Sequence, residues 1–286
     1  MQTSPPFRRI VLTGAAGRLG SVLREPLRAL CDTLVLSDLI EPAVPAQANE
    51  HFIACDLADN ASVKALVAGA DRILHFGGMA QEGAFDKLLP ANFAGQFNIY
   101  DAALEQGVPR VLLASSSHAT GFYESAHTTT ADDAPRADSL YGVSKAYGET
   151  LARFYYDRYG IETACLRIGS CFPQPKSQRC LQSWLSPRDL VELVRCATTA
   201  EEIGYAMVWG VSANDQTRWS GDDAARIGFH AQDSAEPWRE EIMRAKPVPA
   251  DDPQLFWQGG SMVCRDYRDE ATLHPNLPPA PVKIRR

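Results

Sequence analysis

The sequence lacks a long hydrophobic run, a long basic run and any C-x-x-C cysteine pair. The longest apolar run near the N-terminus, residues 10–12, is too short for a secretory signal or a membrane span. The net charge is −7, and basic pairs such as Arg8-Arg9 are isolated, which argues against nucleic-acid or anionic-membrane binding. Seven scattered cysteines and six dispersed histidines lack metal-ligand spacing, so we expect free thiols in a reducing cytoplasm and no metal site.

A glycine-rich loop follows the first apolar run. Residues 10–13 are typical of a strand, and a helical pattern opens within the loop itself. Strand, glycine turn and helix start together form a site for a dinucleotide pyrophosphate, because free amides at a helix N-terminus favour negative charge. The spacing is G-x-x-G-x-x-G, not the usual G-x-G-x-x-G, and a plain glycine turn is the alternative. The candidate cofactor-binding residues of this loop are Gly14, Gly17, Arg18, Leu19 and Gly20.

Strands and helices alternate over most of the 286 residues, which predicts an α/β fold with a Rossmann-type, doubly wound parallel sheet. We expect an NAD-binding domain over 8–169, with its sheet completed by about 186–212. A small substrate-binding part covers 170–286, and its Pro-rich tail from Ala245 should be extended and irregular. The expected strands are 10–13, 33–37, 51–54, 72–76, 108–114, 161–168 and 205–209. The expected helices are 18–30, one from about 59, 87–106, one around 141–145, 187–198, 222–227 and 238–244.

Residues at three strand ends point to the cofactor. Asp38 follows the second strand, where a carboxylate accepts from a ribose 2′-OH and repels a 2′-phosphate, which favours NAD; a plain surface carboxylate is the alternative. Asp56 follows the third strand and either accepts from the adenine amino group or caps the helix near Asp59. Gly77 and Gly78, after the fourth strand, would let the backbone approach the cofactor.

Two polar clusters predict the chemistry. Serines 115–117 and His118 follow the fifth strand, at the edge where ligands bind in such sheets, although a polar loop with capping serines is the alternative. Tyr141 and Lys145 are four residues apart on a predicted helix and share one face. We expect the ammonium to lower the pKa of Tyr141, which would make the phenolate a general base for an alcohol.

A loop after the sixth strand contains two cations, Lys176 and Arg179. A guanidinium can pair with both oxygens of a carboxylate, so Arg179 predicts an acidic substrate. A solvated surface arginine is the alternative. The pair 256–257, Phe-Trp, should dock on the body of the protein or on a second subunit.

Several motifs together resemble a known family. TGAAGRLG, HFGG, SSSH and YGVSK, in order within residues 8–215, are similar to the extended short-chain dehydrogenases/reductases. Closer resemblance, to the uronate dehydrogenases, is found in CDLAD (55–59), YGVSK (141–145), LRIGSC (166–171), VWGVSAND (208–215) and FWQGGSMV (256–263). This resemblance implies NAD-dependent oxidation of a cyclic hexuronic acid, D-galacturonate or D-glucuronate, at C1. The product is an aldarolactone leading to galactarate or glucarate. A nucleotide-sugar epimerase or dehydratase of the same fold is the alternative.

The resemblance also implies roles for residues. Tyr141 would be the base, Lys145 its activator and Ser116 the hydroxyl partner. The implied substrate contacts are Ala80, Ser116, Ser117, His118, Tyr141, Ser170 and Arg179. The further cofactor contacts are Leu57, Phe76, Asn92, Ser115, Tyr141, Lys145, Ile168 and Cys171. Two departures affect epimer preference: the family commonly has Asn where Ser117 stands, and Ala80 lies near a substrate-binding serine of the family. We expect a homo-oligomer.

Overall fold

A seven-stranded parallel sheet forms the centre of the protein, in the order β10-β7-β5-β4-β1-β2-β3. The structure is a computed structural model that describes residues 5–245, 248–249, 252–266 and 269–273. The order reverses beside β1, so the two halves of the sheet are wound in opposite directions, and the predicted doubly wound fold is confirmed. The strands are β1 (Phe7–Thr13), β2 (Cys31–Asp38), β3 (Glu50–Ala54), β4 (Arg72–His75), β5 (Arg110–Ser116), β7 (Glu162–Ile168) and β10 (Tyr205–Gly210).

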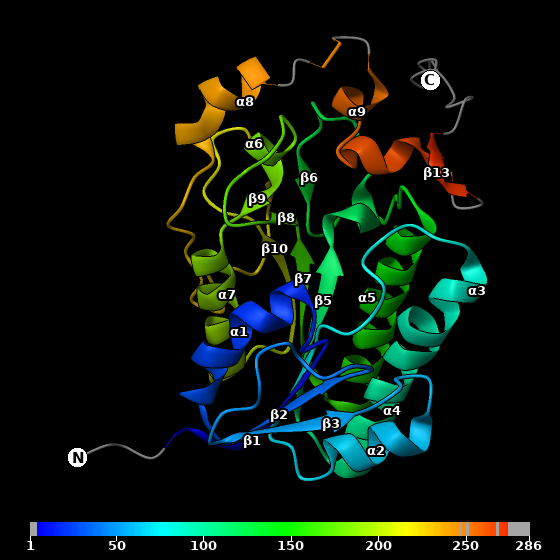
Figure 1. Ribbon diagram of the computed structural model, residues 1–286, viewed down its shortest axis with the longest axis vertical. Helices are drawn as coiled ribbons and strands as arrows, with labels where there is room; N and C mark the ends of the chain where they lie inside the picture. Colours follow the sequence, from blue (N-terminus) through cyan, green and yellow to red (C-terminus); the bar gives the residue numbers. More distant parts are fainter. Residues whose placement is uncertain (1–4, 246–247, 250–251, 267–268, 274–286) are drawn as a thin grey trace.

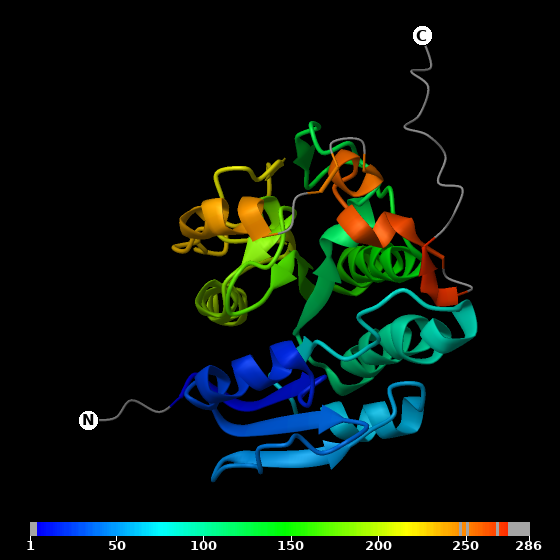
Figure 2. The same cartoon turned by 45° about the horizontal axis from the view of Figure 1, so that its top comes forward.

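Helices cover both faces of this sheet (Figures 1 and 2). Successive residues of β1 belong to opposite cores: Ile10 and Leu12 pack with α1 and α7, whereas Val11 packs with α2 and α4. This alternation is the pleat of a strand buried on both sides. The helices of the two layers are α1 (Arg18–Arg28) and α7 (Pro187–Thr199) on one face, and α2 (Asn60–Val67), α4 (Gly95–Gln106) and α5 (Leu140–Tyr159) on the other.

Local sequence signals explain where the longer helices begin and end. The Ser186 hydroxyl accepts from the Asp189 amide, and Pro187 occupies the first turn of α7, as predicted. The Ser139 hydroxyl caps α5 by accepting from the Gly142 amide. The predicted helix 87–106 begins earlier, as α3 (Phe85–Leu88), and passes through a π-helical turn (Leu89–Ala94) before α4.

The predicted helix at 222–227 is wrong, because the segment forms turns beside the edge strand β10. The Asp222 carboxylate accepts from the Trp209 amide at 2.7 Å and the Asp223 carboxylate accepts from the Met207 amide at 2.8 Å. These bonds give partners to the main-chain amides at the free edge of the sheet. Aspartates that bond to the main chain in this way do not favour a helix.

The C-terminal part adds a layer beyond the carboxyl ends of the strands (Figure 1). The predicted helix at 238–244 is confirmed as α8 (Arg239–Ala245). The irregular tail is wrong for the described residues, which contain α9 (Pro253–Phe256), a 3₁₀ turn (Gly260–Cys264) and the pair β12 (Arg265–Asp266) and β13 (Asp269–Leu273). Residues 246–247, 250–251, 267–268 and 274–286 of the predicted tail lie outside the described residues. Docking on the body is confirmed: the Trp257 ring packs edge-on against Phe122, with 5.5 Å between centroids.

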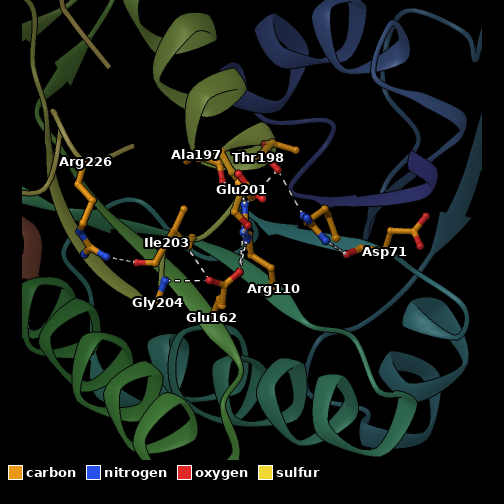
Figure 3. Close-up of polar contacts among 11 residues, drawn as sticks. Asp71, Arg110, Glu162, Ala197, Thr198, Glu201, Ile203, Gly204 and Arg226 are labelled. Atoms are coloured by element: carbon orange, nitrogen blue, oxygen red, sulfur yellow. Dashed lines mark hydrogen bonds and ion pairs between the residues drawn. The ribbon is translucent and has the colours of Figure 1, made fainter. Parts of the chain in front are cut away.

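The opposite, amino-terminal end of the sheet is closed by an ion pair and by hydrogen bonds to main-chain groups (Figure 3). Arg110 is 1% exposed and donates to the Glu162 carboxylate at 2.5 and 2.8 Å. Its Nη1 also donates to the main-chain carbonyls of residues 197, 198 and 200 at the end of α7. These carbonyls lack partners within the helix, so Arg110 caps α7 and joins it to β5 and β7.

Neither a membrane-spanning helix nor a metal site is found among the described residues. No helix there is long and apolar enough to cross a membrane. No group of three or more histidine, cysteine, aspartate or glutamate side chains in the same part of the chain is arranged to hold a metal ion.

Candidate active site

A groove of three adjoining cavities runs along the carboxyl ends of the strands. The first cavity is lined by the ends of β1, β2 and β4, the second by the loop before α1, and the third, of about 220 Å³, by the ends of β5 and β7 and the start of α5. Gly14 and Gly78 line both the first and the second cavity, and Phe76 and Ala80 line both the second and the third. Nearly all predicted site residues line this groove. The exceptions are Asn92 and Ser117.

The glycine loop has the open backbone that a pyrophosphate needs. Gly14 has a φ of +72°, and a Cβ there would lie 2.5 Å from the Phe76 carbonyl oxygen. A Cβ on Gly20 would lie 2.2 Å from the Gly14 carbonyl oxygen, whereas one on Gly17 would come no closer than 3.2 Å to it. Helix α1 has neither a side-chain cap nor an acidic residue in its first turn. Its first amides are therefore free for an anion, and the loop fits a dinucleotide.

Asp38 and Asp56 line the first cavity. The Asp38 carboxylate accepts from the Ala16 and Leu39 amides at 3.0 and 2.8 Å, which fixes it and leaves lone pairs for further donors. Asp56 does not cap α2, because Asp59 is the N-cap, so that interpretation of Asp56 is wrong. Asp56 instead bonds within its own turn beside the cavity.

Asn92 is buried behind the groove. Its Oδ1 accepts from the Met79 amide at 2.8 Å, and its Nδ2 donates to the Met79 carbonyl and the Ser144 hydroxyl. Asn92 thus fixes the loop 77–79 against α5. It shapes the groove through that loop and does not face it.

Tyr141, Lys145 and Ser116 face the third cavity together. Lys145 Nζ lies 5.5 Å from the centre of the Tyr141 ring and donates to the Ala114 carbonyl at 2.8 Å. The expected lowering of the Tyr141 pKa is wrong: burial raises the pKa of Tyr141 to about 12, and the hydrogen bond with Ser116 opposes this only in part. Burial also lowers the pKa of Lys145 to about 8. Both shifts arise because a desolvated site disfavours the charged form, which residue spacing alone does not report.

A buried ion pair, Glu149 with Arg167, lies next to Lys145. Glu149, one turn later on α5, accepts from the Ser115 hydroxyl at 2.5 Å and from Arg167 Nε and Nη2, each at 2.9 Å. The negative charge of Glu149 opposes the lowering of the Lys145 pKa. Ser115 therefore ties the end of β5 to α5 and holds these two elements in register.

Arg179 lines the same cavity as Tyr141 and donates to neutral groups. Its Nη1 donates to Ser170 Oγ at 3.0 Å, its Nη2 to Ser117 Oγ at 3.2 Å and its Nε to the main-chain carbonyl of Gln258 at 2.9 Å. Burial lowers the pKa of Arg179, and the charge of Asp138 opposes this shift. A guanidinium has five N–H groups, so within the described residues one N–H on each terminal nitrogen remains for a ligand. Two such donors suit the two oxygens of a carboxylate.

Buried carboxylates that the sequence did not reveal complete the site. The Asp138 side chain is fully buried, and its Oδ2 lies 2.7 Å from His118 Nδ1. Glu82 accepts from the Leu140 and Tyr141 amides at 3.0 Å each, so it holds the first turn of α5. Burial raises the pKa of Glu82. Asp138 stands three residues before Tyr141, and this closeness in sequence is a signal that could have marked it as a site residue. No feature of the sequence marks Glu82 in this way.

Comparison with known proteins identifies the class. The model of the NAD dependent epimerase/dehydratase family matches residues 10–201, and the chain belongs to this family. Within it, the chain is 47% identical over 262 residues to a uronate dehydrogenase of Pseudomonas putida, covering 91% of this chain and 97% of the relative. A uronate dehydrogenase of Agrobacterium fabrum is 43% identical over 258 residues, 90% of this chain and 97% of the relative. The resemblance to the uronate dehydrogenases is thus confirmed.

Solved structures agree with this assignment. The crystal structure of a glucuronic acid dehydrogenase from Chromohalobacter salexigens superposes with a TM-score of 0.89 at 42% identity, covering 93% of this chain and all of the other. A uronate dehydrogenase variant from Agrobacterium tumefaciens, complexed with NAD, superposes with a TM-score of 0.87 at 42% identity, covering 91% and 98%. The shared cofactor class agrees with the fit of the glycine loop.

Proposed function

We propose that the protein oxidises D-galacturonate or D-glucuronate at C1 with NAD to the aldarolactone, which leads to galactarate or glucarate. The observation that carries this proposal is Arg179, whose two remaining N–H groups serve the same cavity as Tyr141 and Ser116. An anionic group on the substrate would compensate its charge. The similarity to uronate dehydrogenases supports the same substrate class.

Residues of the groove divide the work of holding the cofactor. The amides of the loop 14–20 would bind the pyrophosphate, and Asp38 would accept from the adenosine ribose. Lys145 would bind the nicotinamide ribose. The other predicted contacts, Leu57, Phe76, Ile168 and Cys171, line the same groove. NAD, when bound, supplies a positively charged nicotinamide ring that accepts hydride from C1, and positive charge in a buried cavity favours a phenolate.

Tyr141 releases its own proton to solvent and, as the phenolate, takes the proton of the C1 hydroxyl. With a pKa near 12 the phenol is mostly protonated at neutral pH, so its deprotonation costs free energy. The Ser116 hydroxyl and the Lys145 ammonium both favour the phenolate. Once Tyr141 carries the proton, the single Ser116 O–H donates to the substrate oxygen as it becomes a carbonyl, and this donor is placed before the reaction starts.

The remaining polar groups orient the sugar. Arg179 binds the C6 carboxylate, and Ser117 and Ser170 hold the guanidinium. Ser170 also lines the cavity, whereas Ser117 acts on the substrate through Arg179. His118, fixed by Asp138, presents its other nitrogen to a sugar hydroxyl. Ala80 lines the same cavity, but its side chain has no hydrogen-bonding group. The preference between galacturonate and glucuronate is therefore set by the polar residues around it.

Under this proposal, residues 8–169 bind the cofactor, and residues 186–212 complete the sheet. Residues 170–286 form the substrate-binding part and supply Arg179. The protein acts in the cytoplasm: six of its seven free cysteines are buried, which suits a reducing compartment.

The homo-oligomer forms through the outer side of α4 and α5. Exposed apolar side chains gather there and on the adjoining π-helical turn: Leu89, Phe97, Val143 and Phe154. Exposed apolar side chains on neighbouring helices suit contact with a second copy of the chain. Sedimentation should show an oligomer that Phe154→Glu dissociates, and a monomeric wild-type protein would disprove this part.

Absorbance of NADH tests the activity directly. Adding galacturonate or glucuronate with NAD should produce NADH, whereas galactose and glucose should produce almost none. A nucleotide-sugar epimerase would retain its NAD and convert UDP-sugars with no net NADH. Turnover of UDP-sugars without NADH from either uronic acid would replace the proposal with that alternative.

A further inference from the structure

The segment 256–263 contacts Arg179, although the proposed reaction gives it no role. Arg179 Nε donates to the Gln258 main-chain carbonyl at 2.9 Å. Gly260 has a φ of +62° and packs on the arginine side chain, where a Cβ would lie 2.2 Å from Arg179 Cδ. The segment thus holds both the guanidinium and the carbon chain that carries it.

The Gln258 side chain anchors this segment to the body of the protein. It is 2% exposed, and both ends of its amide are bonded within the protein. Its Oε1 accepts from Thr129 Oγ1 at 3.1 Å and from Trp219 Nε1 at 2.7 Å. Its Nε2 donates to the main-chain carbonyls of Glu124 and His127 at 3.2 and 2.8 Å. A buried amide with this many partners has one orientation, so it fixes the position of its own main-chain carbonyl.

The same segment also touches the other polar pair of the substrate cavity. A Cβ on Gly259 would lie 1.9 Å from Asp138 Oδ2, the oxygen that bonds to His118. The Gly259 amide donates to the Gly121 carbonyl at 2.9 Å. The segment therefore packs against both groups that would orient a sugar acid, Arg179 and the Asp138–His118 pair.

We infer that Gln258 is the positioning residue for Arg179. Its anchored carbonyl takes the Nε hydrogen, Ser170 and Ser117 take one hydrogen from each terminal nitrogen, and the other two are left for the substrate carboxylate. Without the anchored carbonyl, the guanidinium would rotate and lose this two-pronged arrangement. The inference rests on the proposed function, since it concerns recognition of the carboxylate.

The test compares galacturonate with galactose in Gln258→Met, which keeps the length of the side chain and removes its amide. Misplacing a substrate-binding group by about 1 Å costs on the order of 100-fold, so the ratio of kcat/KM values, acid over neutral sugar, should fall about 10- to 100-fold. The fall should come mainly from a higher KM for galacturonate, with the KM for NAD unchanged. This ratio does not depend on the fraction of enzyme that folds.

Two further variants separate positioning from general loosening. Gly260→Ala pushes directly on the Arg179 side chain and should lower the same ratio even if Gln258→Met folds poorly. The matched control is Asn98→Leu, which removes a buried amide that joins α4 to Leu57 and Asn60. It should lower the melting temperature and leave the ratio unchanged.

A double variant gives the decisive outcome. In an Arg179→Ala background, Gln258→Met should have little further effect on the ratio, because the group it positions is gone. An equal loss on both sugars in Gln258→Met, or the same loss with and without Arg179, would overturn the inference. A wild-type enzyme that makes no NADH from either uronic acid would instead refute the proposed function.

Discussion

Arg110 and Arg179 lie at opposite ends of the same sheet and differ in what compensates their charge. Arg110 is fully buried, pairs with the Glu162 carboxylate and caps α7 through main-chain carbonyls. Arg179, at the carboxyl end, bonds two serine hydroxyls and one main-chain carbonyl, and no carboxylate among the described residues is bonded to it. The contrast separates a structural arginine from one that is ready to bind an anion.

The same difference in how charges are compensated is found among the other residues at each end of the sheet. The amino end uses its charges within the protein, around Arg110, Glu162 and Arg226 (Figure 3). The carboxyl end keeps Tyr141 and Lys145 in a cavity where burial disfavours their charged forms. Changes at the carboxyl end should therefore alter rate and selectivity, and changes at the amino end should alter stability.

The largest expected effect is that of Tyr141→Phe. Removing a general base lowers turnover by about 10²- to 10⁴-fold, while the ring still fills its site. Steady-state kcat measures the loss, and titration with NAD should show unchanged affinity. Tyr155→Phe is the matched control, since it removes a hydroxyl from another buried tyrosine of α5. Turnover near the wild-type value in Tyr141→Phe would end the role assigned to this residue.

Arg110→Met should produce the next largest effect, on stability alone. Breaking a buried ion pair by removing one partner costs about 3–5 kcal/mol, because the other charge is left uncompensated. Urea unfolding followed by tryptophan fluorescence measures it, and Glu162→Gln in the same protein should recover part of the loss. The ratio of kcat/KM for galacturonate over galactose should not change. A change in that ratio would remove the distinction between the two ends.

Much of the cofactor half of the groove could be predicted from the sequence. The glycine loop, Asp38 and Gly77-Gly78 each lie at or just beyond the end of a strand, and the carboxyl ends of parallel strands meet at one edge. Position along the chain therefore gave position in space. The seven strands were found for the same reason, since each is a short apolar run bounded by turns or helices.

The substrate half could be predicted only in part. Arg179 was recognised, but the contacts of Asp138, Glu82 and Gln258 arise from packing between segments far apart in the chain. Burial was the other missing quantity. Helical spacing placed Lys145 near Tyr141 correctly, yet the expected change in the Tyr141 pKa had the wrong sign, because desolvation outweighs the hydrogen bond with Ser116. The prediction of an irregular tail was wrong for the same reason, since its prolines did not reveal that Gln258 is buried.

Lys145→Met should raise the free energy of unfolding at pH 7 while lowering turnover. The folded-state pKa of Lys145, about 8, lies below its ordinary value of 10.5, which corresponds to roughly 3 kcal/mol against folding when the lysine is charged. Loss of the bond to the Ala114 carbonyl offsets about 1 kcal/mol, leaving a gain of about 2 kcal/mol. The gain should be full below pH 8 and shrink as the pH rises toward 10.5. Unfolding measured at pH 7 and pH 9.5 checks this, and a gain independent of pH would contradict it.

The smallest effect is expected for Asp38→Ala. Removing a carboxylate that repels the 2′-phosphate should narrow the preference for NAD over NADP by about tenfold, or about 1.4 kcal/mol, with turnover on NAD still measurable. Initial rates with both cofactors measure it. If the wild-type enzyme used NADP as readily as NAD, the assignment of Asp38 to the ribose would be incorrect.

The most direct test of the central claim measures kcat/KM for galacturonate and galactose in the wild type, Arg179→Ala and Arg179→Lys. Removing one partner of a desolvated charge pair costs about 2–5 kcal/mol, so Arg179→Ala should lose about 30-fold to several thousand-fold on galacturonate. Activity on galactose, already slight, should barely change. Arg179→Lys should recover only part, because an ammonium does not make the two-pronged contact. Equal activity of the wild type on both sugars, or an equal loss on both in Arg179→Ala, would contradict the claim that Arg179 binds the substrate carboxylate.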